Sequence, residues 1–231
     1  MDFLLSHEDM QAFWVTLKLA AITTLLLLLI GTPLAWWLSL RKTWYRAVIE
    51  AIIAMPLVLP PTVLGFYLLV AFAPQGIIGK TLNVIGLAPL AFTFSGLVVG
   101  SLIYSMPFVI QPLLNAFHGV GRKPLEAAAT LGASPLDRFF NVAVPMAKRG
   151  FITAITLGFA HTLGEFGVVL MIGGNIPGET QVLSIAIYDH VEALEYQQAH
   201  VLAAVLVLFS LILMLLLYSN NRSRTVLPDD A

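Results

Sequence analysis

The chain of 231 residues is too apolar for a water-soluble domain, because 58% of its residues are hydrophobic and 11% are charged, whereas soluble domains carry roughly a quarter charged residues. It has no cysteine, which excludes disulfides, thiolate nucleophiles and cysteine-ligated metal clusters. The net charge of −1 argues neither for nor against a nucleic-acid partner; we expect none. The composition therefore predicts an all-α, polytopic integral membrane protein in contact with the lipid bilayer.

Five apolar stretches, each close to the roughly 20 residues that cross a bilayer, predict five transmembrane helices. Together they make one transmembrane domain over residues 11–219, with helices at about 15–40, 49–73, 90–114, 150–172 and 199–219. Residues 220–231 are expected to form a polar tail. The first stretch follows acidic residues and precedes no cleavage site, so we expect it to remain as a helix rather than to be a signal peptide.

The positions of lysine and arginine predict the orientation. Ten of the twelve basic residues follow the first predicted helix, follow the third, or lie in the tail. Lys80 falls on the opposite side, and Lys18 lies at the outer end of the first helix. Because cytoplasmic loops carry the excess of positive charge, we expect the N-terminus outside and the C-terminus in the cytoplasm.

The loop 121–149 carries the clearest local signals. Pro124 suits the first turn of a helix, and Gly132 after the helix-forming run Leu125–Leu131 suits a left-handed cap. Ser134 and Asp137 then suit a second helix start. We expect a helix–turn–helix along the cytoplasmic surface that ends at Pro145.

This loop fits the pattern E-A-A-x3-G-x9-V-x-V-P and resembles the EAA loop of binding-protein-dependent ABC importers. In that family a short helix of the loop docks on the ATPase and transmits its closure. The resemblance implies a type I ABC importer fold and a coupling role for five residues: Glu126, Ala127, Ala128, Gly132 and Pro145. The alternative is an ordinary amphipathic loop, because the three letters EAA alone occur by chance in many helices.

Two further segments, Met55–Phe66 (MPLVLPPTVLGF) and Leu163–Thr180 (LGEFGVVLMIGGNIPGET), resemble molybdate permeases. The resemblance implies a permease subunit of an ATP-driven importer for molybdate. It also implies a homodimer, two copies of a cytoplasmic ABC ATPase and a periplasmic oxyanion-binding protein. Sulfate permeases share the general plan, so sulfate and tungstate remain alternatives. A secondary transporter or channel would explain the helices but not the coupling loop.

The chain carries no nucleotide-binding motif of its own. The segment Gly76–Thr81 (GIIGKT) approaches a phosphate-binding loop, but Pro74 stands where the motif needs glycine. We therefore expect no catalytic residue, no metal and no cofactor in this chain, with ATP and magnesium bound by the partner ATPase.

Polar residues and prolines within the predicted helices are candidates for the transport path or its gate: Pro60, Pro61, Thr62, Ser105, His161, Glu165 and Asn175. Prolines interrupt the backbone hydrogen bonds, and such breaks face protein or a water-filled cavity, although a simple packing kink is the alternative. Ser105 could equally mediate helix packing. Asn175 follows two glycines in an expected outer gate or docking loop.

Glu165 is the most unusual of these residues, because a carboxylate within a membrane helix indicates a functional site. It follows His161 by four residues, which would put both on one face of the fourth helix. Many relatives have arginine where His161 stands, which leaves open any cationic role there. One such pair has too few ligands for a metal. We expect Glu165 to order a hydrogen-bond network near the outer gate rather than to touch the anion.

Overall fold

The structure, a computed structural model, describes residues 6–40 and 44–221, the side chains of 216–221 excepted. Within these ranges all regular structure is helical and no strand occurs. Four basic residues used to predict the orientation, Arg41, Lys42, Arg222 and Arg224, and residues 222–231 of the predicted tail lie outside the described residues.

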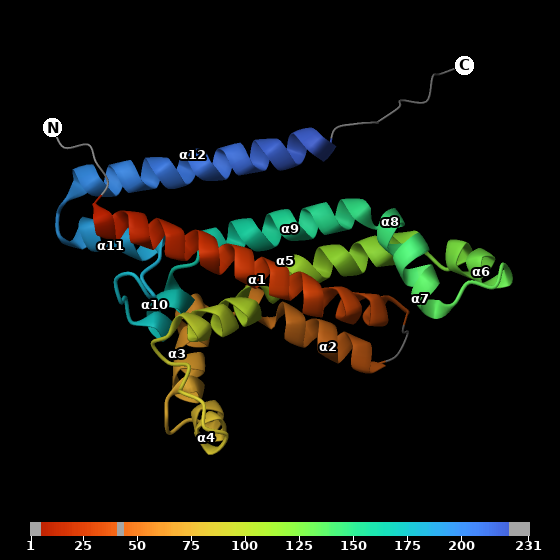
Figure 1. Cartoon of the computed structure of the whole chain (residues 1–231), viewed down its shortest axis with the longest axis horizontal. Helices are drawn as coiled ribbons and strands as arrows, with labels where there is room; N and C mark the ends of the chain where they lie inside the picture. The colour runs from red at the N-terminus through yellow and green to blue at the C-terminus, as the bar shows by residue number, and fades with distance from the viewer. Residues whose placement is uncertain (1–5, 41–43, 222–231) are drawn as a thin grey trace.

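Three long helices form the body of the molecule: α1 (His7–Leu40), α5 (Phe94–Val120) and α9 (Lys148–Leu163). They run alongside one another in Figure 1. Small residues let them approach closely, because a Cβ on Gly158 would lie 2.5 Å from Val109 Cγ2 and one on Gly150 would lie 2.1 Å from Ala116 Cβ. Backbone contact through glycine is the usual way in which membrane helices associate.

The second predicted helix, 49–73, is not continuous. It consists of α2 (Trp44–Ala54), a 3-10 turn over Met55–Leu57 and α3 (Pro61–Phe72). The break falls at the prolines, since Pro60 is extended with φ −55° and ψ 135° and Pro61 opens α3. A further helix that the sequence analysis did not predict, α4 (Ile77–Val84), follows α3, and the two project together from the body (Figure 1).

The fourth predicted helix, 150–172, is also broken. Helix α9 ends at Leu163, and α10 begins only at Gly167 and runs to Gly173. Glu165 therefore lies in the link between two helices, and the expectation that it occupies a continuous helix is wrong. Two helices follow, α11 (Leu183–Glu192), which was not predicted, and α12 (Tyr196–Asn221).

Loop 121–149 folds into short helices at the end of the molecule opposite the α11–α12 link (Figure 1). They are α6 (Lys123–Thr130), α7 (Pro135–Asp137), a π-helical turn over Arg138–Ala143, and α8 (Val144–Met146). The segment Pro135–Met146 meets α9 at a bend of 71°. Pro145 lies beside this bend, and it has no N–H with which to continue the helical hydrogen bonds.

By length and composition the described residues contain four helices that could cross a membrane, or up to five if the bent pair Pro135–Met146 and Lys148–Leu163 is one span. The four are His7–Leu40, Phe94–Val120, Tyr196–Leu215 and Pro61–Val84, the last of which takes in both α3 and α4. The fold class predicted from the sequence, all-α with several spans, is thus confirmed at this coarser level.

Candidate functional site

The link between α9 and α10 places a carboxylate in the interior, where Glu165 is 3% exposed. Both of its oxygens accept hydrogen bonds from hydroxyls of α5. Ser105 Oγ donates to Oε1 at 2.6 Å, and Ser101 Oγ donates to Oε2. Ser101 and Ser105 are themselves buried, and they lie four residues apart on one face of α5. Buried polar groups need such partners, because an unmet group costs about 1–3 kcal/mol.

The network continues to α9 through Ser105. Its Oγ lies 2.8 Å from His161 Nδ1 and 3.0 Å from Thr162 Oγ1. Because a serine hydroxyl has a single proton, donating it to Glu165 leaves His161 Nδ1 as the donor to Ser105. The imidazole stacks on Phe108 with ring centroids 3.8 Å apart, which holds it in this position. His161 thus acts as a hydrogen-bond donor to Ser105 beside the carboxylate.

The backbone of the link is held from the other side. Ser184 Oγ, at the start of α11, donates to the Glu165 carbonyl at 2.5 Å. Close packing joins α10 to α3, because a Cβ on Gly167 would lie 3.1 Å from Pro61 Cβ and 3.6 Å from Thr62 Cγ2. The broken helix is therefore joined to α5 by side-chain hydrogen bonds, to α11 by a backbone contact and to α3 by packing.

The structure brings together three of the residues that the sequence singled out, namely Ser105, His161 and Glu165. His161 Nδ1 lies 3.7 Å from Glu165 Oε1 although the residues between them are not continuously helical. Pro61 and Thr62 border the start of α10. Thr62 is also exposed on the surface of the chain, as is Pro60. Thr162 and Ser184 also belong to the network, although neither was predicted from the sequence.

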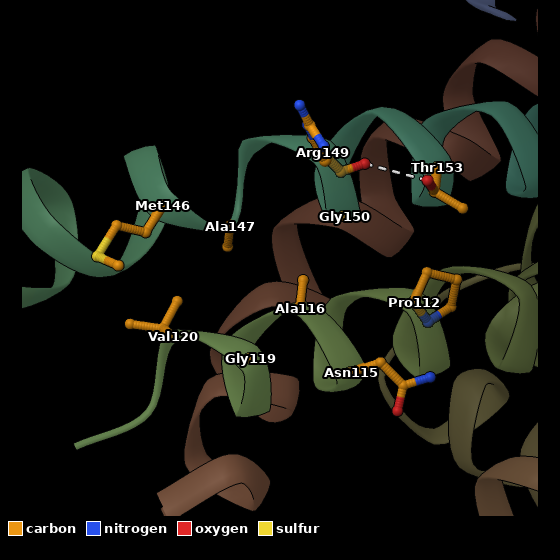
Figure 2. Close-up of a pocket in the computed structure, with 10 residues that line it drawn as sticks. All are labelled: Pro112, Asn115, Ala116, Gly119, Val120, Met146, Ala147, Arg149, Gly150 and Thr153. Atoms are coloured by element: carbon orange, nitrogen blue, oxygen red, sulfur yellow. Dashed lines mark hydrogen bonds between the residues drawn. The ribbon is translucent and has the colours of Figure 1, made fainter. Parts of the chain in front are cut away.

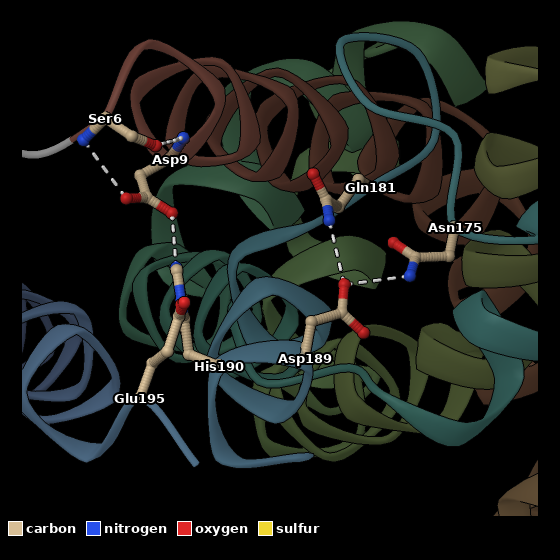
Figure 3. A network of polar contacts seen from close by, with 7 residues as sticks. All are labelled: Ser6, Asp9, Asn175, Gln181, Asp189, His190 and Glu195. Carbon is tan, nitrogen blue, oxygen red and sulfur yellow. Dashed lines mark hydrogen bonds and ion pairs between the residues drawn. The ribbon is translucent and has the colours of Figure 1, made fainter. Parts of the chain in front are cut away.

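Asn175 lies apart from the Glu165 network. It adopts a left-handed conformation with φ 58°, and its Nδ2 donates at 2.8 Å to Asp189 Oδ2, which also accepts from Gln181 Nε2 at 2.9 Å. Figure 3 shows these three side chains converging. The loop after α10 is in this way fastened to α11, and Asp189 and Gln181 carried no signal in the sequence.

A second cluster in Figure 3 joins the start of α1 to the α11–α12 link. Ser6 and Asp9 cap α1 reciprocally, with Ser6 Oγ accepting from Asp9 N and Asp9 Oδ2 accepting from Ser6 N. His190 then lies between Asp9 Oδ1 at 3.0 Å and Glu195 Oε2 at 2.8 Å. Although burial acts to lower it, the hydrogen bonds to the two carboxylates raise the pKa of His190 above its usual value.

Four of the five predicted coupling residues lie in α6 or just after it, namely Glu126, Ala127, Ala128 and Gly132, and the fifth, Pro145, lies in α8. Glu126 and Ala127 are exposed on α6, while the neighbouring Leu125 is buried in the core beneath them. Gly132 has φ +88°, a conformation that favours glycine. Three large apolar side chains of this segment are largely exposed: Leu131 at 89%, Leu136 at 71% and Phe140 at 61%. We call the segment 125–140 the α6–α7 tip.

A cavity of about 500 Å³ opens between the ends of α5 and α9 that lie nearest to α8 (Figure 2). Asn115 and Gly119 line it from α5, and Arg149, Gly150 and Thr153 line it from α9. Arg149 is the cation of this lining. Within the described residues no group of three or more His, Asp or Glu side chains could hold a metal ion.

The fold resembles those of solved ABC transporters. The chain superposes on a chain of the bacterial alginate ABC transporter, solved in complex with an alginate pentasaccharide-bound periplasmic protein. The TM-score is 0.72 and the sequence identity is 17%, over 96% of this chain and 80% of that chain. At this identity the similarity shows the fold alone. The fold is that of the membrane subunit of an ABC importer.

The family follows from the sequence comparisons. Residues 12–225 match the family described as "Binding-protein-dependent transport system inner membrane component", and the chain belongs to this family. It is 58% identical over 218 residues, 94% of this chain and 96% of the relative, to the molybdenum transport system permease protein ModB of Azotobacter vinelandii. A probable sulfate transport system permease protein of Nephroselmis olivacea is 34% identical over 89% of this chain and 72% of its own length. The resemblance to molybdate permeases noted in the sequence is confirmed.

Proposed function

We propose that the chain is the permease subunit of an ATP-driven importer that moves molybdate across the inner membrane by alternating access. The observation that carries this proposal is the 58% identity to the molybdenum permease of Azotobacter vinelandii over almost the whole of both chains. The identity to the sulfate relative is 34%. Tungstate, a tetrahedral dianion of similar size, is the alternative that the permease itself is least able to distinguish.

ATP hydrolysis belongs to a separate ATPase that docks on the α6–α7 tip. The tip presents exposed apolar side chains on a part of the chain with a buried anchor, Leu125. Such an arrangement suits a contact that must transmit force, because the exposed side chains can enter a groove while the anchor passes movement to the body. Glu126 and the small Ala127 and Ala128 allow close approach at this contact, and Gly132 and Pro145 set its turn and its bend.

The anion does not contact Glu165. This carboxylate is buried and would repel a dianion, and the hydroxyls of Ser101 and Ser105 are already engaged as its donors. Glu165 instead keeps the α9–α10 break in place beside α3. The path lies along the exposed start of α3, at Pro60 and Thr62, where the Thr62 hydroxyl is a weak neutral donor that allows an oxyanion to bind and to leave. Asn175 belongs to the outer loop that gates or receives the binding protein.

Two copies of this chain assemble with two ATPase subunits, because each copy supplies one α6–α7 tip. The α3–α4 projection exposes a row of large apolar side chains, with Phe66 at 51%, Tyr67 at 66% and Val70 at 51%. We assign this surface to the contact between the two copies and the path between them. A periplasmic binding protein delivers the oxyanion to the side of the membrane opposite the α6–α7 tip. In this orientation the N-terminus is outside and the C-terminus is cytoplasmic.

A matched pair of variants tests the docking assignment. Leu136 at the tip and Leu194 at the α11–α12 link are both 71% exposed and lie at opposite ends of the molecule. Leu136→Asp should abolish co-purification of the ATPase and uptake of molybdate into vesicles, because it places a charge in the contact. Leu194→Asp should leave the ATPase bound. Retention of the ATPase by Leu136→Asp at the wild-type level would contradict the assignment.

A further inference from the structure

Helix α1 is longer than a bilayer requires. Its 34 residues, at 1.5 Å each, extend over about 51 Å, whereas the hydrocarbon core is about 30 Å thick. The part from Leu19 to Leu40 carries no charge and spans about 33 Å by the same rise per residue. Lys18 immediately precedes this part. It therefore lies at the boundary between the hydrocarbon and the lipid headgroups.

Lys18 has no carboxylate partner in the part of the chain that the structure describes. Its Nζ lies 4.5 Å from the centroid of the Phe94 ring, at the start of α5. A cation–aromatic contact of this kind contributes about 0.5–1 kcal/mol at an exposed site, and it leaves the positive charge without a counterion. At the boundary of the hydrocarbon, the anion available in quantity is the phosphate of a phospholipid.

Lys18 lines a shallow groove of about 630 Å³ on α1. Val15, Leu17 and Ala21 form its apolar part, and Gln11 and Trp14 line it beyond Lys18, away from the charge-free part of the helix. Gly178 of the loop after α10 closes it at the level of Gln11, because a Cβ on Gly178 would lie 3.0 Å from Gln11 Oε1. The groove thus offers a polar end and an apolar wall on one helix.

The groove opens onto the face of α1 that the rest of the chain leaves uncovered. Trp14 is 64% exposed, Leu25 is 58% exposed and Leu29 is 63% exposed. These residues and Lys18 follow one another at intervals of four, seven and four, which places them in one stripe along the helix. Tryptophan is enriched at the membrane interface. Trp14 precedes Lys18 by about one helical turn and so lies on the headgroup side of the hydrocarbon boundary. The stripe therefore matches the parts of a phospholipid in order. Trp14 lies at the level of the headgroup, Lys18 at the level of the phosphate, and Leu25 and Leu29 at the level of the acyl chains.

We propose that this groove is a binding site for one phospholipid, whose phosphate pairs with Lys18 and whose acyl chain lies along Leu25 and Leu29. Trp14 covers the headgroup, and Gln11 is the further hydrogen-bond donor within the groove. An anionic headgroup such as phosphatidylglycerol binds more tightly than zwitterionic phosphatidylcholine. One lysine near the membrane surface contributes a preference of about fivefold. The site does not depend on which anion is transported or on which side of the membrane it faces.

Native mass spectrometry of the purified transporter assembly tests this site, with phosphatidylglycerol and phosphatidylcholine as probes. The wild-type chain should retain one phosphatidylglycerol per copy with about a fivefold preference over phosphatidylcholine. Lys18→Met should lose the preference, and Lys18→Arg should keep it. Lys80→Met is the matched control, because Lys80 is an exposed lysine on α4, away from the groove, and it should bind lipid as the wild type does.

Fluorescence provides a second readout that does not require Lys18 to be changed. The difference in emission between the wild type and Trp14→Phe isolates Trp14 from the other three tryptophans. Brominated phosphatidylglycerol should quench this emission at lower mole fractions than brominated phosphatidylcholine. Equal quenching by the two lipids, or an unchanged preference for phosphatidylglycerol in Lys18→Met, overturns the proposal. So does conversion of Lys18→Met from dimer to monomer with an unchanged preference for phosphatidylglycerol, because the groove would then be a contact between copies.

Discussion

Replacement of Glu165 separates a hydrogen-bonding role from a charge role. Glu165→Gln keeps one acceptor oxygen and nearly the same volume, so Ser101 or Ser105 retains its partner. We expect it to cost less than about 1 kcal/mol, because hydrogen bonds within membrane proteins contribute about 0.6 kcal/mol on average. Glu165→Ala removes the partner of Ser101, which is 1% exposed, and leaves a cavity. We expect that variant to lose about 2–4 kcal/mol.

Ser105 is affected less than Ser101 by either change. It keeps His161 Nδ1 and Thr162 Oγ1 as neighbours, whereas Glu165 is the hydrogen-bond partner that the structure gives to Ser101. Ser101→Ala should therefore be additive with changes at distant sites but not with Glu165→Gln. A double-mutant cycle between these two residues should give a coupling energy of about 0.5–2 kcal/mol.

The assay is unfolding of the purified chain in detergent, followed by uptake of molybdate into vesicles that contain the complete transporter. Glu165→Gln should retain most of the uptake, and Glu165→Ala should lose both stability and uptake. The reasoning is refuted if Glu165→Ala is as stable as Glu165→Gln. It is also refuted if Glu165→Gln loses uptake at unchanged stability, because the negative charge would then be essential.

Three further predictions concern other parts of the chain. Gly150→Ala should cost about 1–3 kcal/mol in an unfolding assay, because its Cβ would lie 2.1 Å from that of Ala116. Gly119→Ala, on the same cavity, meets nothing within 4 Å and should cost nothing. Equal effects of the two changes would contradict the close packing. His190 has a raised pKa, so its stabilising contribution is complete below the ordinary value of about 6.5 and is lost as the pH rises through the raised value. The thermal midpoint of the wild type should therefore exceed that of His190→Gln at about pH 6 and approach it near about pH 9, and a gap that grows with pH would contradict this. Gly132→Val should cost about 1–2 kcal/mol locally, because φ is +88° there, and should weaken ATPase binding without unfolding the membrane domain, whereas normal assembly and uptake would refute the coupling role.

The sequence predicted the long helices well because their signal is a run of apolar residues. Helices α1, α5 and α12 overlap the charge-free stretches that predicted them, although α1 begins at His7 and not at 15, and α5 covers Phe94–Val120 and not 90–114. A run of apolar residues does not show where a helix breaks. The link at Glu165 was missed because Gly164 and Gly167 are tolerated in membrane helices and gave no clear stop signal.

The short helices α4 and α11 were missed for a related reason. Both lie in connections between the predicted transmembrane helices. Helix α4 has 8 residues and α11 has 10, so each is too short to produce the pattern of a membrane crossing. The Glu165 network was partly predictable, because Ser105, His161 and Glu165 are unusual in apolar helices. Ser184 could not have been found in this way, since its contact is with the backbone carbonyl of a residue that only the fold brings near.

The most direct test of the proposed function is the ATPase activity of the complete transporter in vesicles, measured with the periplasmic binding protein and one oxyanion at a time. Molybdate should stimulate hydrolysis in the presence of the binding protein, and the stimulation should vanish in Leu136→Asp. Stimulation by sulfate but not by molybdate would contradict the assigned substrate. Molybdate uptake that continues without the ATPase would contradict the assignment of the chain as an ATP-driven permease.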